Sequence, residues 1–269
     1  MAAGTAWVVP LALLLTQVVA TALGAPQAKA PQTPPPFQLT PAEGARLDKI
    51  LVAWQQASGR VKTFEAGFTR FEYDRVFGTP DQPKTTEKGE VKFASPNRGL
   101  FSVGGPQPEK WLCDGKSLFV YDFRLKSLTE FKLPPELRGS AVPDLPQLCI
   151  LGWIFDPFGP LRFARIFGTP PGQLMQQYYV RAVTPKAEEA KSIWLQFLPR
   201  LPRERANFDV ALLIIDAKSL QPAAARIYLP GGKTNFTFVF ENVRVNDPHG
   251  LTAKAFDAST PPGWRRVVE

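Results

Sequence analysis

The residue types that most often carry catalysis are scarce in this chain. His249 is the only histidine and lies between Pro248 and Gly250, so a histidine-based catalytic triad has few places to form. Cys113 and Cys149 are the only cysteines, and their wide separation offers no zinc-ligand spacing. The sequence therefore indicates a protein that is not an enzyme and that holds no metal or other cofactor.

Two other patterns that can carry chemistry are typical of turns in this sequence. Asp114 and Asp122 could form a carboxylate pair, but an aspartate at the end of a hairpin is explained by turn chemistry alone. Gly104–Gly105 and Gly231–Gly232 lack the lysine and the helix of a phosphate-binding loop. We therefore interpret these residues as parts of turns.

The two cysteines leave one covalent alternative open. Cys113 ends a predicted strand, whereas Cys149 lies in an apolar helical stretch. A disulfide would be stable in an exported protein, but it needs α-carbons about 4.4–6.8 Å apart. We favour two unpaired, buried thiols, with the disulfide as the alternative.

Large apolar side chains are abundant in this chain. Hydrophobic residues make up 44% of the sequence and aromatic residues 12%. If the strands that carry them form a curved sheet that does not close, its concave face is an apolar pocket suited to acyl chains, each buried methylene contributing about 0.8 kcal/mol. The alternative is that these side chains simply fill the core. The predicted lining residues are Phe93, Phe101, Trp111, Phe119, Tyr121, Leu148, Leu151, Phe155, Trp194, Phe236 and Phe238.

Short strands separated by turns are the elements that must position these residues. In the stretch 89–122, apolar and polar residues alternate, and Asp114-Gly115 is a strong hairpin signal. Gly231-Gly232 predicts another hairpin turn. Further strands are expected at residues 64–69, 127–133, 177–183, 193–198, 208–216, 224–229 and 236–245, and a long mobile loop at residues 73–88.

Two helices accompany the predicted strands. Thr40-Pro41-Ala42-Glu43 has the form of a capping box, and Leu47, Ile50, Leu51 and Trp54 then follow at the spacing of one helix face. The second helix, Leu145–Phe155, is apolar almost all round and too short to span a bilayer. We expect it to lie as a lid in the concavity of the sheet.

The N-terminal residues differ in composition from the rest. Residues 1–24 contain no charge and an apolar run, and Ala22 and Gly24 are the small residues of a signal peptidase site. We predict a signal peptide at residues 1–24, cleaved between Gly24 and Ala25, with an uncleaved anchor as the alternative. Residues 25–39 are Pro-rich and predict a disordered tether, and residues 40–269 a single domain.

Charge restricts the partners. The chain has 32 Lys and Arg against 24 Asp and Glu, a formal net charge of +8. Such an excess favours an anionic membrane surface or a membrane-bound acceptor. No nucleic-acid-binding motif is present, so we do not expect nucleic acid as a partner.

Several segments together resemble the periplasmic lipoprotein carrier family, the LolA/LolB-like proteins. Residues 89–122 carry the family's order of a glycine, a strand, a Pro-Asn turn, Leu-Phe and then Asp-Gly-Lys. Phe64–Thr69 is similar to the first strand, Trp194–Pro199 to a mid-chain strand, and Phe256–Gly263 to the closing strand with its Pro-Pro-Gly tail. The resemblance runs in order along nearly the whole chain, as a divergent member would show.

The resemblance implies a fold, a ligand class and a location. The fold is α+β, mainly β: an unclosed antiparallel β-barrel with helices packed in its concave side. The ligand is an acylated lipoprotein or lipid. A monomeric protein carries it through the periplasm and catalyses no reaction. One departure affects the lid, because Ser95 stands where the carriers have an arginine, with Arg98 three residues on.

Two alternatives share this fold. One is an envelope-stress sensor or regulator of the RseB-like type, although those proteins usually carry a second C-terminal domain. The other is a structural envelope protein whose cavity is filled by its own side chains.

Overall fold

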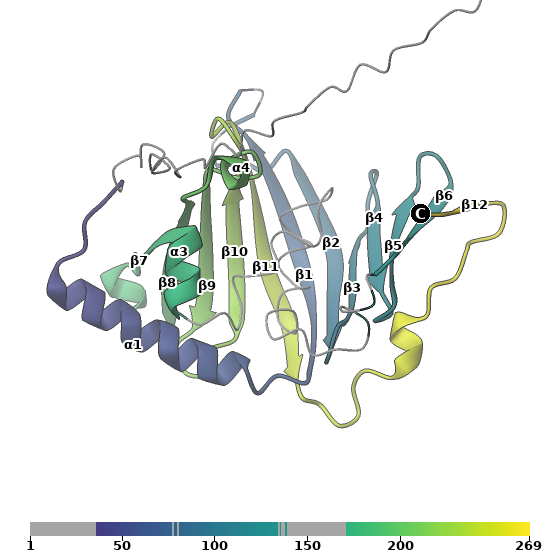
Figure 1. Ribbon diagram of the computed structural model, residues 1–269. Coiled ribbons are helices and arrows are strands. Elements are labelled where there is room, and N and C mark those ends of the chain that lie inside the picture. Colours follow the sequence, from purple (N-terminus) through teal and green to yellow (C-terminus); the bar gives the residue numbers. More distant parts are fainter. Residues whose placement is uncertain (1–35, 77, 80, 134, 136–137, 139–170) are drawn as a thin grey trace, which may run out of the picture. The chain divides into compact units, whose positions relative to one another are not determined.

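A single twelve-stranded sheet forms the body of the protein, as the computed structural model in Figure 1 shows. The structure describes residues 36–76, 78–79, 81–133, 135, 138 and 171–269. The strand order is β12-β6-β5-β4-β3-β2-β1-β11-β10-β9-β8-β7, and the end strands β12 and β7 do not pair with each other. All neighbours are antiparallel except β12 and β6, which are parallel. The predicted fold class, a mainly β, unclosed antiparallel sheet with helices on one face, is confirmed.

The elements follow one another in the order of the chain. They are α1 (Pro41–Ser58), β1 (Thr63–Asp74), β2 (Thr85–Ala94), β3 (Arg98–Val103), β4 (Glu109–Cys113), β5 (Ser117–Asp122), β6 (Ser127–Lys132), α3 (Pro171–Gln177), β7 (Tyr178–Ala182), η2 (Lys186–Glu188), β8 (Ser192–Pro199), α4 (Pro202–Arg205), β9 (Val210–Asp216), β10 (Pro222–Tyr228), β11 (Thr234–Val245), η3 (Ala253–Phe256) and β12 (Arg265–Val268).

Helix α1 begins where its capping box predicts. The Glu43 backbone N–H donates to Thr40 Oγ1 at 3.3 Å, and the Thr40 backbone N–H donates to Glu43 Oε2 at 2.8 Å. The hydrogen bonds from Thr40 also lower the pKa of Glu43. Leu47, Leu51 and Trp54 are buried, so the predicted apolar face is the one that packs against the sheet.

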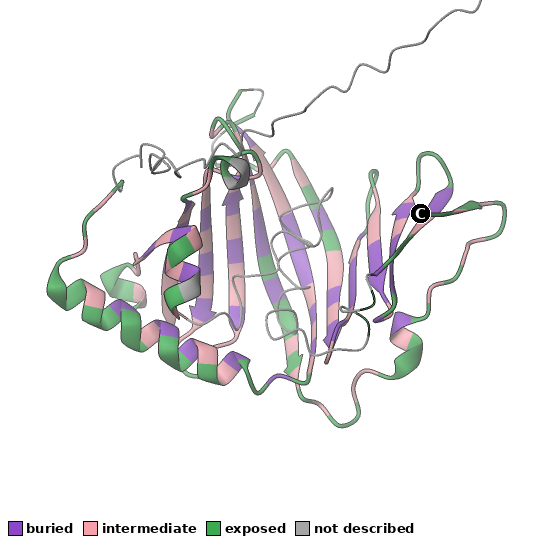
Figure 2. Ribbon diagram, in the orientation of Figure 1, coloured by how far each residue is buried: buried purple, intermediate pink, exposed green. Residues whose placement is uncertain are grey.

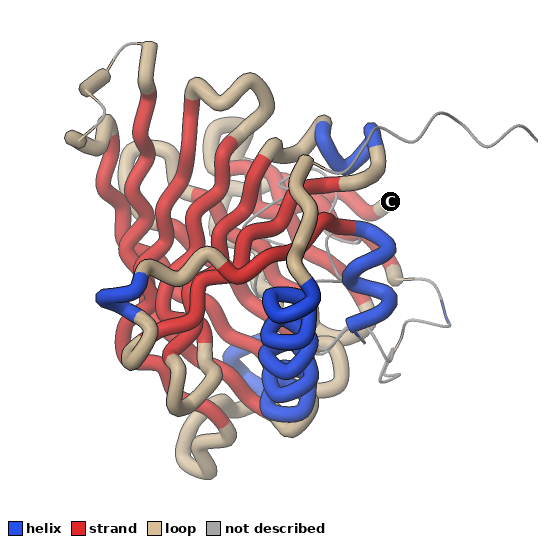
Figure 3. Tube along the Cα trace, turned by 90° about the vertical axis from the view of Figure 1, so that its left-hand side faces the viewer, coloured by secondary structure: helices blue, strands red, loops and turns tan. Residues whose placement is uncertain are grey.

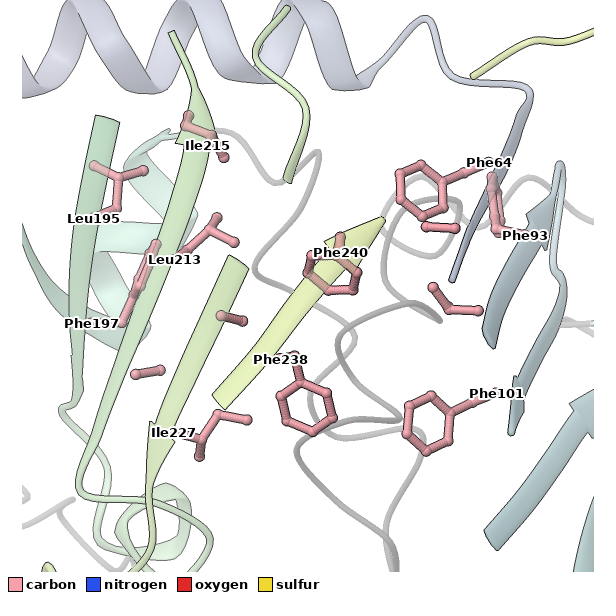
Figure 4. Close-up of a cluster of buried hydrophobic side chains, with 14 of the residues drawn as sticks. Phe64, Phe93, Phe101, Leu195, Phe197, Leu213, Ile215, Ile227, Phe238 and Phe240 are labelled. Atoms are coloured by element: carbon pink, nitrogen blue, oxygen red, sulfur yellow. The ribbon is translucent and has the colours of Figure 1, made fainter. Parts of the chain in front are cut away.

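The face of the sheet that packs against α1 and α3 is called the inner face below. Side chains at alternate strand positions reach it, for example Phe64, Ala66 and Phe68 on β1. Figure 4 shows phenylalanine, leucine and isoleucine side chains from seven strands, β1 to β3 and β8 to β11, meeting on this face. Figure 2 shows the resulting alternation of buried and less buried positions along the strands. Burial of this layer supplies the main hydrophobic stabilisation of the fold.

The opposite, outer face is covered in one region by the C-terminal segment. Leu100, Leu112 and Leu128 form a second cluster there with Phe256 of η3, and Leu251 and Trp264 pack against it. Residue Phe256, expected in a closing strand by resemblance, lies instead in a 3₁₀ helix, and the closing strand is β12. The apolar Phe256 side chain is thereby buried on the sheet, which a solvent-facing edge strand would not achieve.

The expected loop at residues 73–88 is shorter than predicted. Strand β1 continues to Asp74 and β2 begins at Thr85, where Thr85 pairs with Glu72. The Thr85 hydroxyl donates to Glu72 Oε2 at 3.2 Å. Polar side chains that bond across the hairpin therefore extend the strands into a stretch whose glycine and prolines suggested a loop.

The hairpin turns predicted at Asp114-Gly115 and at Gly231-Gly232 are confirmed. Gly115 has φ +93°, and Gly231 and Gly232 have φ +83° and +63°. These backbone conformations are strained for residues with a side chain.

Gly89 has no room for a side chain for a different reason, the close approach of its neighbours. A Cβ there would clash with the Phe68 ring and the Ser102 carbonyl oxygen, whereas a Cβ at Gly67 would lie 3.8 Å from its nearest neighbour, the Glu241 carbonyl oxygen. We expect Gly89→Ala to lower the free energy of unfolding by about 1–3 kcal/mol through overpacking. Urea denaturation of Gly89→Ala and Gly67→Ala tests this, and equal midpoints would contradict it.

Candidate ligand-binding site

The described helices cover one end of the inner face and leave the other end open. Helix α1 packs against α3 and β7, and Figures 1 and 3 show both helices over the β7–β10 end of the sheet. Over β4 and β5, a groove of about 1010 Å³ opens instead. Its volume is at the upper limit of the range of about 300–1,000 Å³ typical of small-molecule sites.

Most of the surface that lines the groove is apolar, and its polar or charged lining residues are Gln107, Glu109, Asp122 and Arg124. Trp111 and Val120 pair across β4 and β5 and form its floor, and Phe123 lies in the turn after β5. Residues 106–108, Pro-Gln-Pro, form one wall. Such a surface binds an elongated apolar group by excluding water and needs no reactive residue.

A ladder of aromatic rings connects the groove to the packed core. The Phe68 and Phe101 rings stack with centroids 5.3 Å apart, and the Phe101 and Trp111 rings with centroids 5.4 Å apart. Both rings are buried, and Trp111, 8% exposed, is the one that borders the groove. The floor of the groove is thus held rigidly by side chains that belong to the core.

A buried charge cluster, Arg70 with Glu87 and Glu109, lies at one end of the groove. Arg70 Nη2 lies 2.6 Å from Glu87 Oε2, and Arg70 Nη1 lies 2.7 Å from Glu109 Oε1. The Arg70 and Glu87 side chains are 10% and 7% exposed, whereas Glu109 is 33% exposed and lines the groove. The Glu109 carboxylate can therefore accept a further hydrogen bond from the polar end of a ligand.

The surroundings of Arg70 keep it charged. Burial lowers the pKa of its guanidinium, but the charges of Glu109 and Glu87 and the hydrogen bonds to them raise it above the ordinary value. The Phe236 ring lies 5.4 Å from the guanidinium carbon. Above Glu87 the chain turns at Gly105, with φ +107°, where a Cβ would come within 3.0 Å of Glu87 Oε1. The turn therefore closes over the cluster and restricts its access to water.

Five of the predicted lining residues lie on the inner face: Phe93, Phe101, Trp111, Phe236 and Phe238. Phe93, Phe101 and Phe238 are 0%, 1% and 2% exposed, so they are packed core and not the wall of an open cavity. Only Trp111 of the five lines the groove. For the residues that the structure describes, Phe93, Phe101 and Phe238 therefore fit the alternative prediction, in which apolar side chains simply fill the core.

Three other predicted residues lie on the opposite face, which corrects the prediction. Phe119 belongs to the outer cluster, and so does Tyr121, although Tyr121 also borders the groove at its edge. Trp194 also faces outward, where its Nε1 donates to Ser192 Oγ at 2.9 Å. Strands β5 and β8 are apolar on both faces, so their sequences do not tell inner from outer positions.

The predicted lid lies outside the described residues. Leu148, Leu151, Phe155 and Cys149 all fall there, as does the predicted signal peptide. Arg98, three residues after Ser95, directs its guanidinium over the Phe256 ring of the outer cluster at 5.5 Å. It therefore does not face the groove.

Cys113 is a free, buried thiol that faces the core. Its Sγ–H donates to the Asn97 carbonyl oxygen at 3.1 Å, and burial raises the pKa of the thiol to about 11. A thiol is reactive as the thiolate, so the folded environment should make this one inert.

This inertness can be measured. At pH 8 we expect iodoacetamide to alkylate Cys113 in folded protein at least about a hundredfold more slowly than in urea-unfolded protein. Mass spectrometry of the Cys113 peptide over time checks this. Equal rates in the two states would show that the thiol is exposed.

The described residues include no group of three or more His, Cys, Asp or Glu side chains placed to hold a metal ion. His249 is exposed in a turn, where its backbone N–H donates to Asp247 Oδ1 at 2.9 Å. In the described part of the chain, no helix has the length and apolarity to cross a membrane.

Sequence reasoning missed several residues of the groove. Glu109, Val120 and Phe123 were not predicted, and neither were the partners Arg70 and Glu87. The position of Arg70 could have been predicted, because Phe64, Ala66 and Phe68 alternate along β1 onto the buried face and Arg70 is the next residue in this series. Glu87 and Glu109 have no such signal, because only the strand register brings them to Arg70.

The chain has similar folds among solved structures but no match among family models or curated sequences. Similar solved structures include a LolA superfamily protein from Nitrosomonas europaea, 11% identical with a TM-score of 0.36, covering 78% of this chain and 96% of that chain. An uncharacterized conserved protein from Thermus thermophilus is 12% identical with a TM-score of 0.46, covering 83% and 99%. The lipoprotein LppX of Mycobacterium tuberculosis is 11% identical with a TM-score of 0.40, covering 77% and 99%.

Proposed function

We propose that this protein binds an acylated ligand, a lipid or a lipoprotein, in the groove over β4 and β5, and that it does so without enzymatic chemistry. The apolar groove of about 1010 Å³ that the described residues leave over β4 and β5 is the observation that carries the proposal. Its Trp111–Val120 floor suits a methylene chain. The acyl chain lies along this floor, and the polar end of the ligand lies toward Glu109.

The proposal includes export and a transport role. The predicted signal peptide at residues 1–24 would deliver a monomer to the periplasm or another exported location, where the ligand is carried between membranes. The sequence motifs shared with the lipoprotein carriers support this role. The two alternative functions, an RseB-like sensor and a structural protein with a filled cavity, should give different results in the experiments below.

Mass spectrometry of lipid extracted from the purified protein is the first test. We expect one acylated species or class in stoichiometric amount. An extract without lipid, combined with no uptake of a fluorescent acyl probe, would favour the filled core and defeat the proposal. A sensor, by contrast, would bind lipid but release it only when it engages a regulatory protein.

A charge placed on the groove floor should abolish binding. We expect Val120→Glu to weaken the affinity for a fluorescent acyl probe at least about tenfold, because the new carboxylate must lose its water when a chain is bound. Ser102→Glu adds the same charge on the outer face of β3 and should leave the affinity unchanged. Probe titration corrected for the folded fraction is the measurement, and equal affinities of the two variants would exclude the groove.

A further inference from the structure

A second pocket, separate from the groove, lies on the outer face of the sheet where β1, β11 and β10 run side by side (Figure 1). The strand register pairs Asn235 of β11 with Tyr73 on one side and with Tyr228 on the other. These are outer positions, because Phe236, the next residue of β11, faces inward. All three paired residues line the pocket. Asn235 therefore lies between two tyrosines on a rigid part of the sheet.

The Asn235 side chain is buried, but it has no hydrogen-bond partner within the described part of the chain. The residue is 7% exposed, and no hydrogen bond joins its amide to another described residue. Buried polar groups are nearly always bonded, and one that is not costs stability. Because Asn235 lines the pocket, its amide offers a donor and an acceptor to a molecule that enters there.

The charged residues of the pocket balance one another. Its described lining residues include the arginines Arg75 and Arg226 and the aspartates Asp74 and Asp81, which gives a formal charge of zero. Arg226 Nε donates to Thr237 Oγ1 at 2.9 Å, which holds this side chain across β10 and β11. Its terminal Nη groups form no ion pair within 4.0 Å with a described residue. They are therefore available as donors to an uncharged ligand.

The composition of the pocket defines the chemistry of a ligand. Apart from the tyrosine rings, the described lining side chains are polar or charged, and none is aliphatic. A matching molecule is therefore neutral and carries polar groups on all sides. Hydroxyl groups are both donors and acceptors, as the Asn235 amide is, and tyrosine rings offer flat apolar faces. The α-carbons of Tyr73 and Tyr228 are two strand spacings apart, about 10 Å, which leaves room for one ring above Asn235.

From these observations we propose that this pocket binds a neutral saccharide. Asn235 and Arg226 hydrogen-bond the hydroxyl groups of one sugar ring, and Tyr73 and Tyr228 pack beside it. The pocket volume, about 250 Å³, lies below the range of about 300–1,000 Å³ for drug-sized ligands, so a single ring fits better than a long chain. The groove lies over β4 and β5 on the inner face, so either proposal can fail without the other.

Ligand-observed NMR with the full chain tests the ligand class. The probes are the methyl glycosides of glucose, galactose, mannose and N-acetylglucosamine, because they carry neither charge nor a lipid chain. We expect saturation transfer from the protein to at least one of them. Transfer to none of them would overturn the proposal, and so would transfer only to the charged probes glutamate or inorganic phosphate.

Substitutions in the pocket test the location. We expect Asn235→Leu and Tyr228→Leu each to weaken the affinity for the bound glycoside about tenfold or more, because sugar hydroxyls lose their partners or the ring loses its packing face. Tyr179→Leu removes an outer-face tyrosine that does not line the pocket, and Val120→Glu alters the groove. Both controls should leave the affinity unchanged. Equal affinities of the pocket and control variants would overturn the proposal.

The stability of Asn235→Leu separates a binding role from a structural one. Removal of a buried amide that lacks a partner should leave the urea midpoint unchanged or raise it. The matched control is Asn97→Leu, because Asn97 is 2% exposed and its Nδ2 donates to the Gly115 carbonyl oxygen at 3.2 Å. This control should lower the midpoint. If Asn235→Leu lowers it as far as Asn97→Leu does, the Asn235 amide is a structural group and the proposal is overturned.

Discussion

Replacing Arg70 with methionine should lower the free energy of unfolding by about 3–5 kcal/mol, the usual cost of breaking a buried ion pair. The substitution leaves the Glu87 carboxylate, 7% exposed, without its cation beneath the turn at Gly105. Burial of an unpaired charge is expensive because water can no longer solvate it. Urea denaturation followed by circular dichroism gives the midpoint and slope.

Two controls show whether burial of charge is the cause. Arg70→Met/Glu87→Leu removes both buried charges and should recover most of the loss, since an apolar pair can replace an ion pair of similar volume. Arg46→Met breaks the exposed pair with Glu189, in which Arg46 Nη2 lies 3.1 Å from Glu189 Oε1, and should cost about 0–1 kcal/mol. If Arg70→Met costs no more than Arg46→Met, the cluster is solvated and the argument for a closed end of the groove is wrong.

Phe238→Ala should also cost about 3–5 kcal/mol, because its ring is packed on all sides. Phe238 is 2% exposed, and its ring centroid lies 5.5 Å from that of Phe68 in an edge-to-face contact. The neighbouring Val239 faces outward and is 38% exposed, so Val239→Ala on the same strand should cost less than about 1 kcal/mol.

The same pair of variants decides between core and cavity for this residue. Loss of stability with unchanged acyl-probe affinity per folded molecule is the expected result for Phe238→Ala. Lost affinity with nearly unchanged stability would mean that Phe238 lines a cavity, as the sequence alone suggested.

Elements whose signals are local were predictable from the sequence. The start of α1 was found because the capping box Thr40–Glu43 satisfies its own backbone groups, and this depends on four adjacent residues. The Gly115 and Gly231–Gly232 turns were found because few other residues adopt positive φ without strain. The open sheet followed from strands with period-two patterns and from the order of the shared motifs.

Features that depend on which strands meet could not be predicted in this way. Phe119 and Trp194 were placed on the wrong face because their strands bury or half-bury apolar residues on both sides. The Arg70–Glu87–Glu109 cluster joins three strands through their register, and no spacing in the sequence predicts that register. The groove lies where the described helices stop covering the sheet. How far they cover it depends on tertiary packing, which the sequence pattern does not show.

Photo-crosslinking with a fatty acid that carries a diazirine in its acyl chain tests the central claim most directly. The account predicts that the labelled peptides contain residues 106–111 or 120–124, the floor and walls of the groove. Excess unlabelled fatty acid should prevent this labelling, and so should Val120→Glu. Labelling that falls instead on the outer face of β7 to β11 or on the N-terminal apolar run, with the groove peptides unmodified, would contradict the claim that the groove is the acyl-binding site.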